Sequence, residues 1–151
     1  MSIPVISDAA VTAAALLDAA ALIEQAGAGG LSVTCYYDQV SIFAGARLGD
    51  ARSRADLVAA LGELAGAARC RQRDDSRSPA AWLTATGQAG GTTVEITTPL
   101  AVRAVPGGTL AAGPDGQQAV IAAGQQLPAG WRWVTDLDGQ PGDEPARREV
   151  A

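Results

Sequence analysis

Histidine, lysine and asparagine are all absent from this chain of 151 residues. Histidine is the side chain whose unperturbed pKa lies near neutrality, so its absence removes the usual base of nucleophilic triads, the imidazole ligands of metal sites and most proton shuttles. The two cysteines, Cys35 and Cys70, form no CxxC pair, which argues against a structural zinc site. We therefore expect no enzyme activity, no bound metal and no cofactor.

The N-terminus lacks a basic region, and no long apolar run is free of charge. Asp8 and Asp18 bracket and interrupt the alanine-rich segment, so neither a signal peptide nor a membrane span is predicted. The formal net charge of -5 argues against a surface adapted as a whole to DNA or to an anionic membrane. We expect a cytoplasmic protein with reduced cysteines.

The first predicted helix covers residues 8–25, with Ser7 or Asp8 as its N-cap and Gly27 as its stop. Its apolar residues lie on most sides of the helix rather than in one stripe. Such a helix is either buried on more than one face or shared between subunits. The sequence leaves both interpretations open, a core helix with small alanine contacts and a helix-mediated homodimer.

Residues 31–44 alternate with period two, which predicts a β-hairpin with Asp38 and Gln39 at the turn. The core face of this hairpin would carry Val33, Cys35, Tyr37, Val40, Ile42 and Ala44. A second helix is predicted over residues 53–64, with Ser53 and Asp56 at capping-box spacing and Gly66 as the stop.

Three further strands are predicted at residues 68–73, 81–86 and 92–98, the last two joined by a loop at residues 87–91. The resulting order is α-β-β-α-β-β-β. Because hairpins dominate this order, we expect an α+β fold of two layers, an antiparallel sheet with both helices on one face.

After residue 100 the chain consists of short alternating pieces separated by proline and glycine. Residues 113–116 have the signature of a type I turn between candidate strands at 109–111 and 119–121. From residue 136 the chain is polar and acidic. The predicted organisation is an α+β core domain at residues 1–100, a β-rich appendage packed on it at 101–135, and a disordered acidic tail at 136–151.

One loose motif lies in the predicted closing hairpin and consists of Trp82, Gly87, Gly90, Gly91, Val94, Ile96 and Pro99. With this motif, residues 31–100 resemble short uncharacterised proteins found in actinobacterial genomes, their phages and integrated mobile elements. The resemblance implies a mobile-element origin, and it brings no activity to these residues.

Arginines alternate along one predicted strand and so project from the same face; the row consists of Arg69, Arg71 and Arg73, with Arg77 just beyond. Guanidinium groups about 6 to 7 Å apart can follow a phosphate backbone. An arginine-rich strand is also a common solvated face or a protected sheet edge, and the neighbouring aspartates offset its charge. Nucleic-acid binding and a structural role both remain open.

Trp131 and Trp133 share a face near the end of the appendage, with Arg132 opposite. Exposed tryptophan and arginine are favoured contact residues at protein interfaces, so these three residues are candidates for binding a partner. Alternatively, the tryptophans clamp the appendage onto the main sheet.

The function that the sequence favours is a non-catalytic protein–protein interaction or accessory module, and we expect a phage or mobile element to encode it. The partner is another protein, and the first helix offers a route to a homodimer. A nucleic-acid-binding protein that uses the arginine strand is the first alternative. An enzyme that uses carboxylates or a bound cofactor is the second and least favoured alternative. The sequence spacing does not force any pair of carboxylates to converge, as such an enzyme would require.

Overall fold

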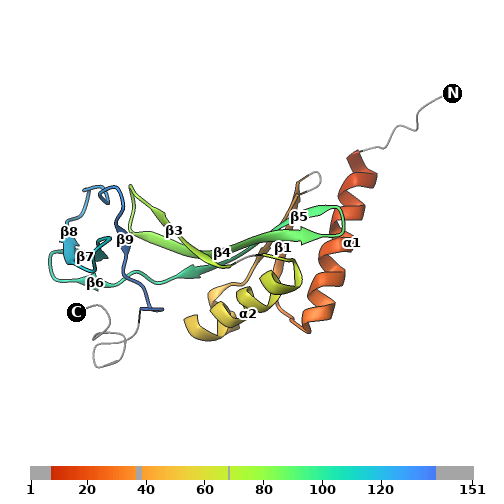
Figure 1. Cartoon of the computed structure of the whole chain (residues 1–151), viewed down its shortest axis with the longest axis horizontal. Helices are drawn as coiled ribbons and strands as arrows, with labels where there is room; N and C mark the ends of the chain where they lie inside the picture. The colour runs from red at the N-terminus through yellow and green to blue at the C-terminus, as the bar shows by residue number, and fades with distance from the viewer. Residues whose placement is uncertain (1–7, 37–38, 68, 139–151) are drawn as a thin grey trace. The chain divides into compact units, whose positions relative to one another are not determined.

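The computed structural model describes residues 8–36, 39–67 and 69–138, and it has the α+β architecture that the sequence predicts (Figure 1). The chain forms two compact units. The first unit comprises Met1–Arg71 and Leu83–Thr98, and the second comprises Gln72–Trp82 and Pro99–Ala151. This division differs from the expected boundary at residue 100, because the hairpin segment at residues 72–82 belongs to the second unit.

Helix α1 spans Asp8–Ala26 and helix α2 spans Ala51–Leu64, preceded by the short 3-10 helix η1 at Ala46–Leu48. Gly27 follows α1 with a φ of 69°, a conformation that glycine adopts without strain, as predicted for the stop. The proposed N-cap Ser7 lies outside the described residues.

Helix α2 begins two residues earlier than predicted, because its N-cap is Asp50. The Asp50 carboxylate accepts a hydrogen bond of 2.8 Å from the backbone N–H of Ser53. This bond, together with the nearby arginines, lowers the pKa of Asp50. The expected capping box of Ser53 and Asp56 is therefore wrong, and Ser53 lies inside the first turn.

Five strands form the main sheet in the order β1-β2-β5-β4-β3. Their bounds are β1 (Ser32–Tyr36), β2 (Gln39–Phe43), β3 (Arg71–Asp75), β4 (Ala80–Ala89) and β5 (Thr92–Leu100). The order α-β-β-α-β-β-β is as predicted, but the sheet is mixed rather than antiparallel, because β2 pairs with β5 in parallel. Parallel pairing is available to these two strands since the long connection through α2, β3 and β4 separates them.

The first hairpin keeps the predicted alternation of faces in a shifted register, but Val33, expected on the core face, is 37% exposed. Val33 pairs with Ile42 and Cys35 with Val40, so these side chains share a face. Tyr36 pairs with Gln39, so the connection consists of residues 37–38 instead of 38–39. Tyr37 and Asp38 themselves lie outside the described residues.

Strand β4 continues through most of the segment predicted to be a loop, leaving only Gly90 and Gly91 between β4 and β5. Gly87 lies so close to the Ala65 carbonyl at the end of α2 that a Cβ would overlap it. The next residue, Gln88, donates its backbone N–H to that carbonyl at 2.8 Å. Glycine therefore serves here to let the strand approach the helix.

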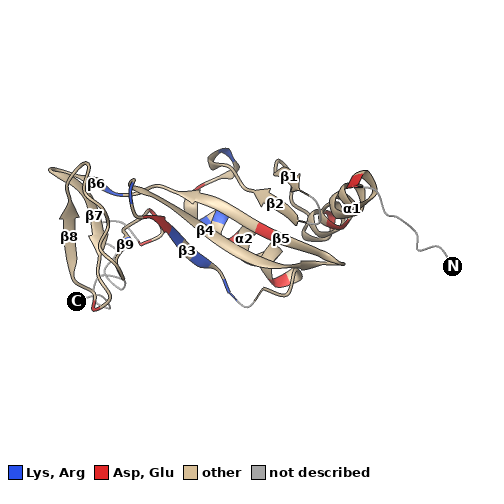
Figure 2. Ribbon diagram, turned by 90° about the horizontal axis from the view of Figure 1, so that it is seen from above, with Lys and Arg blue, Asp and Glu red and all other residues tan. Residues whose placement is uncertain are grey.

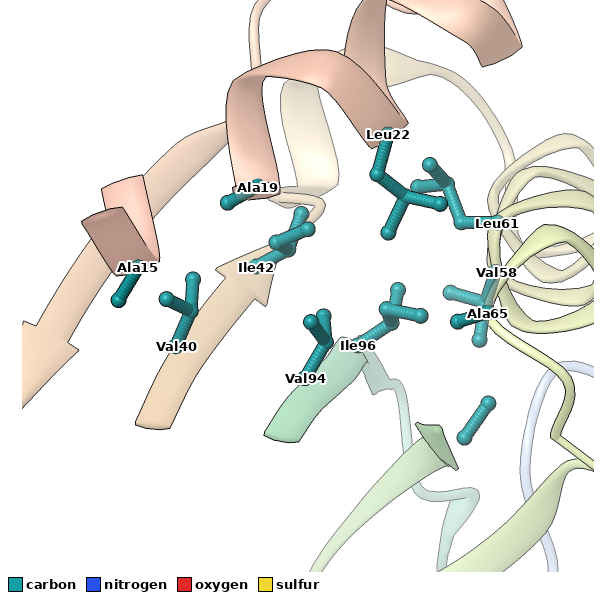
Figure 3. Packing of buried hydrophobic residues seen from close by; sticks show 11 residues of the cluster. Ala15, Ala19, Leu22, Val40, Ile42, Val58, Leu61, Ala65, Val94 and Ile96 are labelled. Carbon is teal, nitrogen blue, oxygen red and sulfur yellow. The ribbon is translucent and has the colours of Figure 1, made fainter. Parts of the chain in front are cut away.

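Both helices cover the same face of the sheet in the first unit, which makes a two-layer packing (Figure 3). The core combines small residues of α1 with larger aliphatic residues of α2 and the central strands: Ala15, Ala19, Leu22, Val40, Ile42, Val58, Leu61, Ala65, Ala85, Val94 and Ile96. Alternation in β2 and β5 turns these side chains toward the helices.

Arg54 is a buried cation of this unit, with 6% of its surface exposed. Its guanidinium donates to the hydroxyl of Thr98 at 2.8 Å and to the carbonyl of Gly49 at 3.1 Å. The Thr98 hydroxyl in turn donates to the carbonyl of Ala44 at 2.7 Å. Arg54 thus links α2 to the ends of β5 and β2.

The second unit contains a small sheet with the order β6-β7-β8, in which β9 also pairs with β7. The strands are β6 (Ala104–Val105), β7 (Gly108–Ala112), β8 (Gln118–Ile121) and β9 (Arg132–Trp133). The backbone N–H of Gly116 donates to the carbonyl of Gly113 at 3.1 Å, which closes the turn predicted at residues 113–116. The β-rich character of this segment is as predicted.

The folded chain extends into the segment predicted to be a disordered tail. The backbone N–H of Asp136 donates to the Ala101 carbonyl at 3.0 Å, and the Asp138 carboxylate accepts a 2.8 Å bond from the N–H of Thr135. The assignment of residues 136–138 to the tail is therefore wrong, because their partners lie far back in the chain or in a local turn. Residues 139–151 lie outside the described residues.

Replacing Arg54 by alanine is expected to destabilise the fold by about 2 to 3 kcal/mol, because the change leaves the Gly49 carbonyl without this donor and opens a buried volume. Arg52→Ala removes the same side chain from an exposed position of α2 and should change stability by no more than about 0.5 kcal/mol. Urea unfolding of the two variants measures the difference. Equal unfolding midpoints would show that Arg54 has no structural role.

Candidate protein-binding surface

Trp133 is buried in the second unit, with 1% of its surface exposed. Its indole N–H donates to the carbonyl of Asp75 at 2.8 Å, and its backbone N–H donates to the carboxylate of Asp74 at 3.1 Å. The Gln72 amide donates to the Trp133 carbonyl at 2.8 Å. These bonds favour the clamp that the sequence left open, and the buried indole presents no surface to a partner, contrary to its assignment as a partner-binding residue.

Arg132 is held by Asp138 in a two-pronged ion pair. The guanidinium Nη2 lies 2.8 Å from Oδ1 of Asp138, and Nη1 donates to Oδ2 at 2.9 Å. Burial alone would raise the pKa of Asp138, but the bonds from Arg132 and Thr135 outweigh it and lower that pKa. The same bond raises the pKa of Arg132. Trp131 is half-exposed, so of the three predicted contact residues Trp131 and Arg132 retain surface.

The arginines of the predicted row are all exposed: Arg69, Arg71, Arg73 and Arg77. Strand β3 begins at Arg71, so Arg69 precedes it, and residue 68, predicted to start the strand, lies outside the described residues. Arg69 and Arg71 belong to the first unit, whereas Arg73 and Arg77 belong to the second. A nucleic-acid surface made by this row stays a prediction.

The thiols do not have the environment of nucleophiles. The thiol of Cys35 donates to the carbonyl of Thr12 at 3.7 Å. Burial raises the pKa of the Cys70 thiol, which lowers its thiolate fraction at neutral pH. Cys70 lines a cavity of about 260 Å³ together with Ala59, Gly62, Glu63, Ala67, Arg69 and Ala85. Across residues 8–36, 39–67 and 69–138, no three Cys, Asp or Glu side chains are grouped so that they could hold a metal ion.

The first unit leaves one side of α1 exposed and apolar. Toward the core, α1 presents Ala15, Ala19 and Leu22. On the opposite side, which we call the outer face of α1, the exposed residues are Ala9, Ala10, Ala13, Ala14, Leu16, Leu17, Ala20, Ala21 and Glu24. Leu17 is 71% exposed and Leu16 is 42% exposed. The outer face therefore lacks the polar residues that usually cover the exposed side of an amphipathic helix.

The charged residues of α1 are all acidic (Figure 2). The carboxylate of Asp18 accepts a 2.7 Å bond from the hydroxyl of Thr92, which holds it against the sheet. Asp8 and Glu24 lie near opposite ends of the helix. Between residues 9 and 21 the outer face thus carries only alanine and leucine.

By length and composition, α1 meets the criteria for a membrane span. Its inner side, however, packs with Val40, Ile42 and Leu61 in the core of the first unit. One helix of this kind is weak evidence for a membrane span, because core helices of soluble proteins and N-terminal signal sequences meet the same criteria.

No protein-family model, curated protein or solved structure matches this chain. The sequence indicated that α1 is apolar on most sides, but only the structure separates its buried side from its outer face.

Trp133→Ala is expected to destabilise the protein by about 3 to 5 kcal/mol, because it leaves a cavity and removes the donor to the Asp75 carbonyl. Trp131→Ala, at a half-exposed position, should cost about 1 kcal/mol or less. Thermal and urea unfolding measure both values. A small effect of Trp133→Ala would contradict the clamp.

Asp138 should stabilise the folded protein at neutral pH and lose this stabilising effect in acid. Because folding lowers its pKa below the ordinary value of 3.8, its contribution is fully present above that value and is lost as the pH falls through the lower, folded-state pKa. Asp138→Asn should therefore destabilise the protein at neutral pH and approach the wild type as the pH falls from 3.8 through the lower, folded-state pKa. Urea unfolding across this range measures the difference, with Asp115→Asn in the exposed turn as the control. A stability difference that does not change with pH would overturn this expectation.

Proposed function

We propose that this protein is a non-catalytic protein-binding module and that the outer face of α1 is its docking surface. The observation that supports this most directly is the exposure of Leu17, 71%, in the middle of a helix face that carries only alanine and leucine from residue 9 to residue 21. Contiguous exposed apolar surface on a small domain is typical of a protein interface.

Docking on this face has a clear driving force. Removing one exposed leucine from water contributes about 1.5 to 3 kcal/mol, and neighbouring alanines allow a partner to approach closely. No charged side chain must be desolvated between residues 9 and 21 of the outer face, so this gain is not offset by ion burial. A partner with an amphipathic helix or an apolar groove has the matching chemistry.

A non-catalytic role is supported by the reactive groups that the chain offers. It has no histidine, and its half-buried Cys70 has a raised pKa that favours the inert thiol. A cytoplasmic location is part of the proposal, because both cysteines are thiols rather than disulfide partners. An accessory role in a phage or mobile element remains part of it on the strength of the sequence resemblance.

Nucleic-acid binding remains the second candidate function. It is favoured by one observation, the exposure of Arg71 and Arg73 at alternate positions of β3. Asp74 lies on the other side of the strand, where its carboxylate accepts hydrogen bonds from the Gln72 amide and the Trp133 backbone N–H. The guanidinium groups are thereby presented on the side away from that carboxylate.

Leu17→Glu is expected to abolish capture of the partner without changing the fold, because it places a charge at the centre of the outer face. The matched control is Leu64→Glu, which makes the same change at a 41% exposed position of α2. The tagged wild type and both variants are used as baits in host lysate, with and without nuclease, and captured proteins are quantified by mass spectrometry.

Near-stoichiometric capture that survives nuclease, is lost in Leu17→Glu and persists in Leu64→Glu is the expected result. Capture that disappears with nuclease would replace the proposal with the arginine strand. Capture that is equal for both variants would exclude the outer face of α1 as the docking surface. Circular dichroism and unfolding midpoints of the three baits show that the variants are folded.

A further inference from the structure

We propose that the outer face of α1 binds a second copy of this chain, with the two α1 helices packed antiparallel about Leu17. This inference rests on the proposed docking role of that face and names its occupant.

The residue pattern of the outer face suits a two-fold axis. Leu17 is the tenth of the 19 residues of α1, so it lies at the midpoint of the helix. Exposed alanines flank it on both sides, at positions 13 and 14 before it and positions 20 and 21 after it. In a two-fold pair the same patch must complement itself. Antiparallel packing about Leu17 brings Ala13 opposite the partner's Ala21 and Ala14 opposite the partner's Ala20, and small residues at these points let the helices approach closely.

Charge supplies the reason for the antiparallel direction. Glu24 lies in the last turn of α1, which has no basic residue, so its carboxylate is close to the negative end of its own helix dipole. In the antiparallel pair Glu24 lies beside the first turn of the partner's α1, which is the positive end of that helix dipole. The carboxylate that is unfavourably placed in one copy is therefore favourably placed between two copies. Asp8 is nearly opposite Glu24 around the helix and does not share its face.

The other arrangements fit these charges less well. A parallel pair would place the two Glu24 carboxylates together and align the two helix dipoles side by side. A membrane surface would meet a helix with acidic residues and no basic residue (Figure 2), whereas helices that bind lipid surfaces carry lysine and arginine on their polar face.

Sedimentation equilibrium of the purified full chain tests the pairing directly. The wild type is expected to associate to a dimer, and Leu17→Glu to weaken the dimer by about 100-fold or more, since two leucines and two introduced charges meet at the axis. Leu64→Glu should dimerise like the wild type. A wild type that stays monomeric at every concentration reached would overturn the proposal.

Disulfide cross-linking distinguishes an antiparallel from a parallel pair of α1 helices. Leu17→Cys should cross-link with itself under mild oxidation, because residue 17 lies on the axis. Ala13→Cys alone should not, because the two copies of residue 13 are about 12 Å apart along antiparallel helices, but it should cross-link when mixed with Ala21→Cys. Self-linking of Ala13→Cys would show a parallel pair and overturn the antiparallel arrangement. The parent chain, with Cys35 and Cys70, is the control for cross-links through the native thiols.

The Glu24→Lys variant tests the electrostatic contribution to pairing without lowering the stability of the monomer. In one copy, lysine in the last turn is better placed than glutamate, so the unfolding midpoint of the monomer should not fall. Between copies, lysine faces the positive end of the partner's helix, so dimer dissociation should rise by about three- to tenfold at low salt. Unchanged or tighter association of this variant would exclude the antiparallel arrangement.

The failure of this inference differs from the failure of the proposed function. A monomeric wild type whose bait still captures a different protein through Leu17 would leave the docking surface in place with another occupant. A monomeric wild type that captures nothing through Leu17 would remove both. Co-sedimentation with phosphatidylcholine or phosphatidylglycerol vesicles that is lost in Leu17→Glu would assign the face to lipid and overturn the pairing.

Discussion

The parallel pairing of β2 with β5 is the constraint on which the first unit depends. It joins the N-terminal hairpin to the closing hairpin of the sheet, and a parallel pair cannot be connected by a tight turn. Helix α2 lies in the connection that this geometry requires, and Arg54 of that helix reaches Thr98 at the end of β5. Thr98 donates to the Ala44 carbonyl just after β2, so one buried guanidinium joins the crossover helix to both strands that it connects.

The inner side and the outer face of α1 have different packing requirements. Toward the sheet, Ala15 and Ala19 allow the helix backbone to lie close to Val40 and Ile42, and Asp18 is fixed by Thr92 beside Gly90, where a Cβ would meet its carboxylate. These contacts require small residues on the inner side only. Nothing in the packing of the first unit requires Leu17 on the outer face, where exposed leucine brings the monomer no stability. The proposed pairing through this face would give Leu17 a role there.

The sequence predicted those structural features that depend on residues close together in the chain. Both helices, the faces of the first hairpin and the turn at residues 113–116 depend on neighbouring residues, and they are found. The parallel pairing could not be predicted, because Val40, Ile42, Val94 and Ile96 alternate in the same way in parallel and antiparallel strands. The burial of Trp133 depends on Asp75, 58 positions earlier, and no periodicity reports such a contact. The α2 start was missed because Asp50 and Ser53 are both plausible N-caps.

The chain has few aromatic residues, and this scarcity limits the chemistry available to the proposed docking surface. The chain has three tryptophans, two tyrosines and one phenylalanine. Trp133, one of the two tryptophans that the sequence offered as contacts, holds β9 against residues 72–82, and the Arg132–Asp138 ion pair lies beside it. An interface on the outer face of α1 must then obtain its free energy from aliphatic area and close backbone approach rather than from aromatic anchors. Each such contact is weak, so a stable interface needs many of them along an extended helix face rather than a small pocket. In a two-fold antiparallel pair, the same helix face from both copies supplies these contacts.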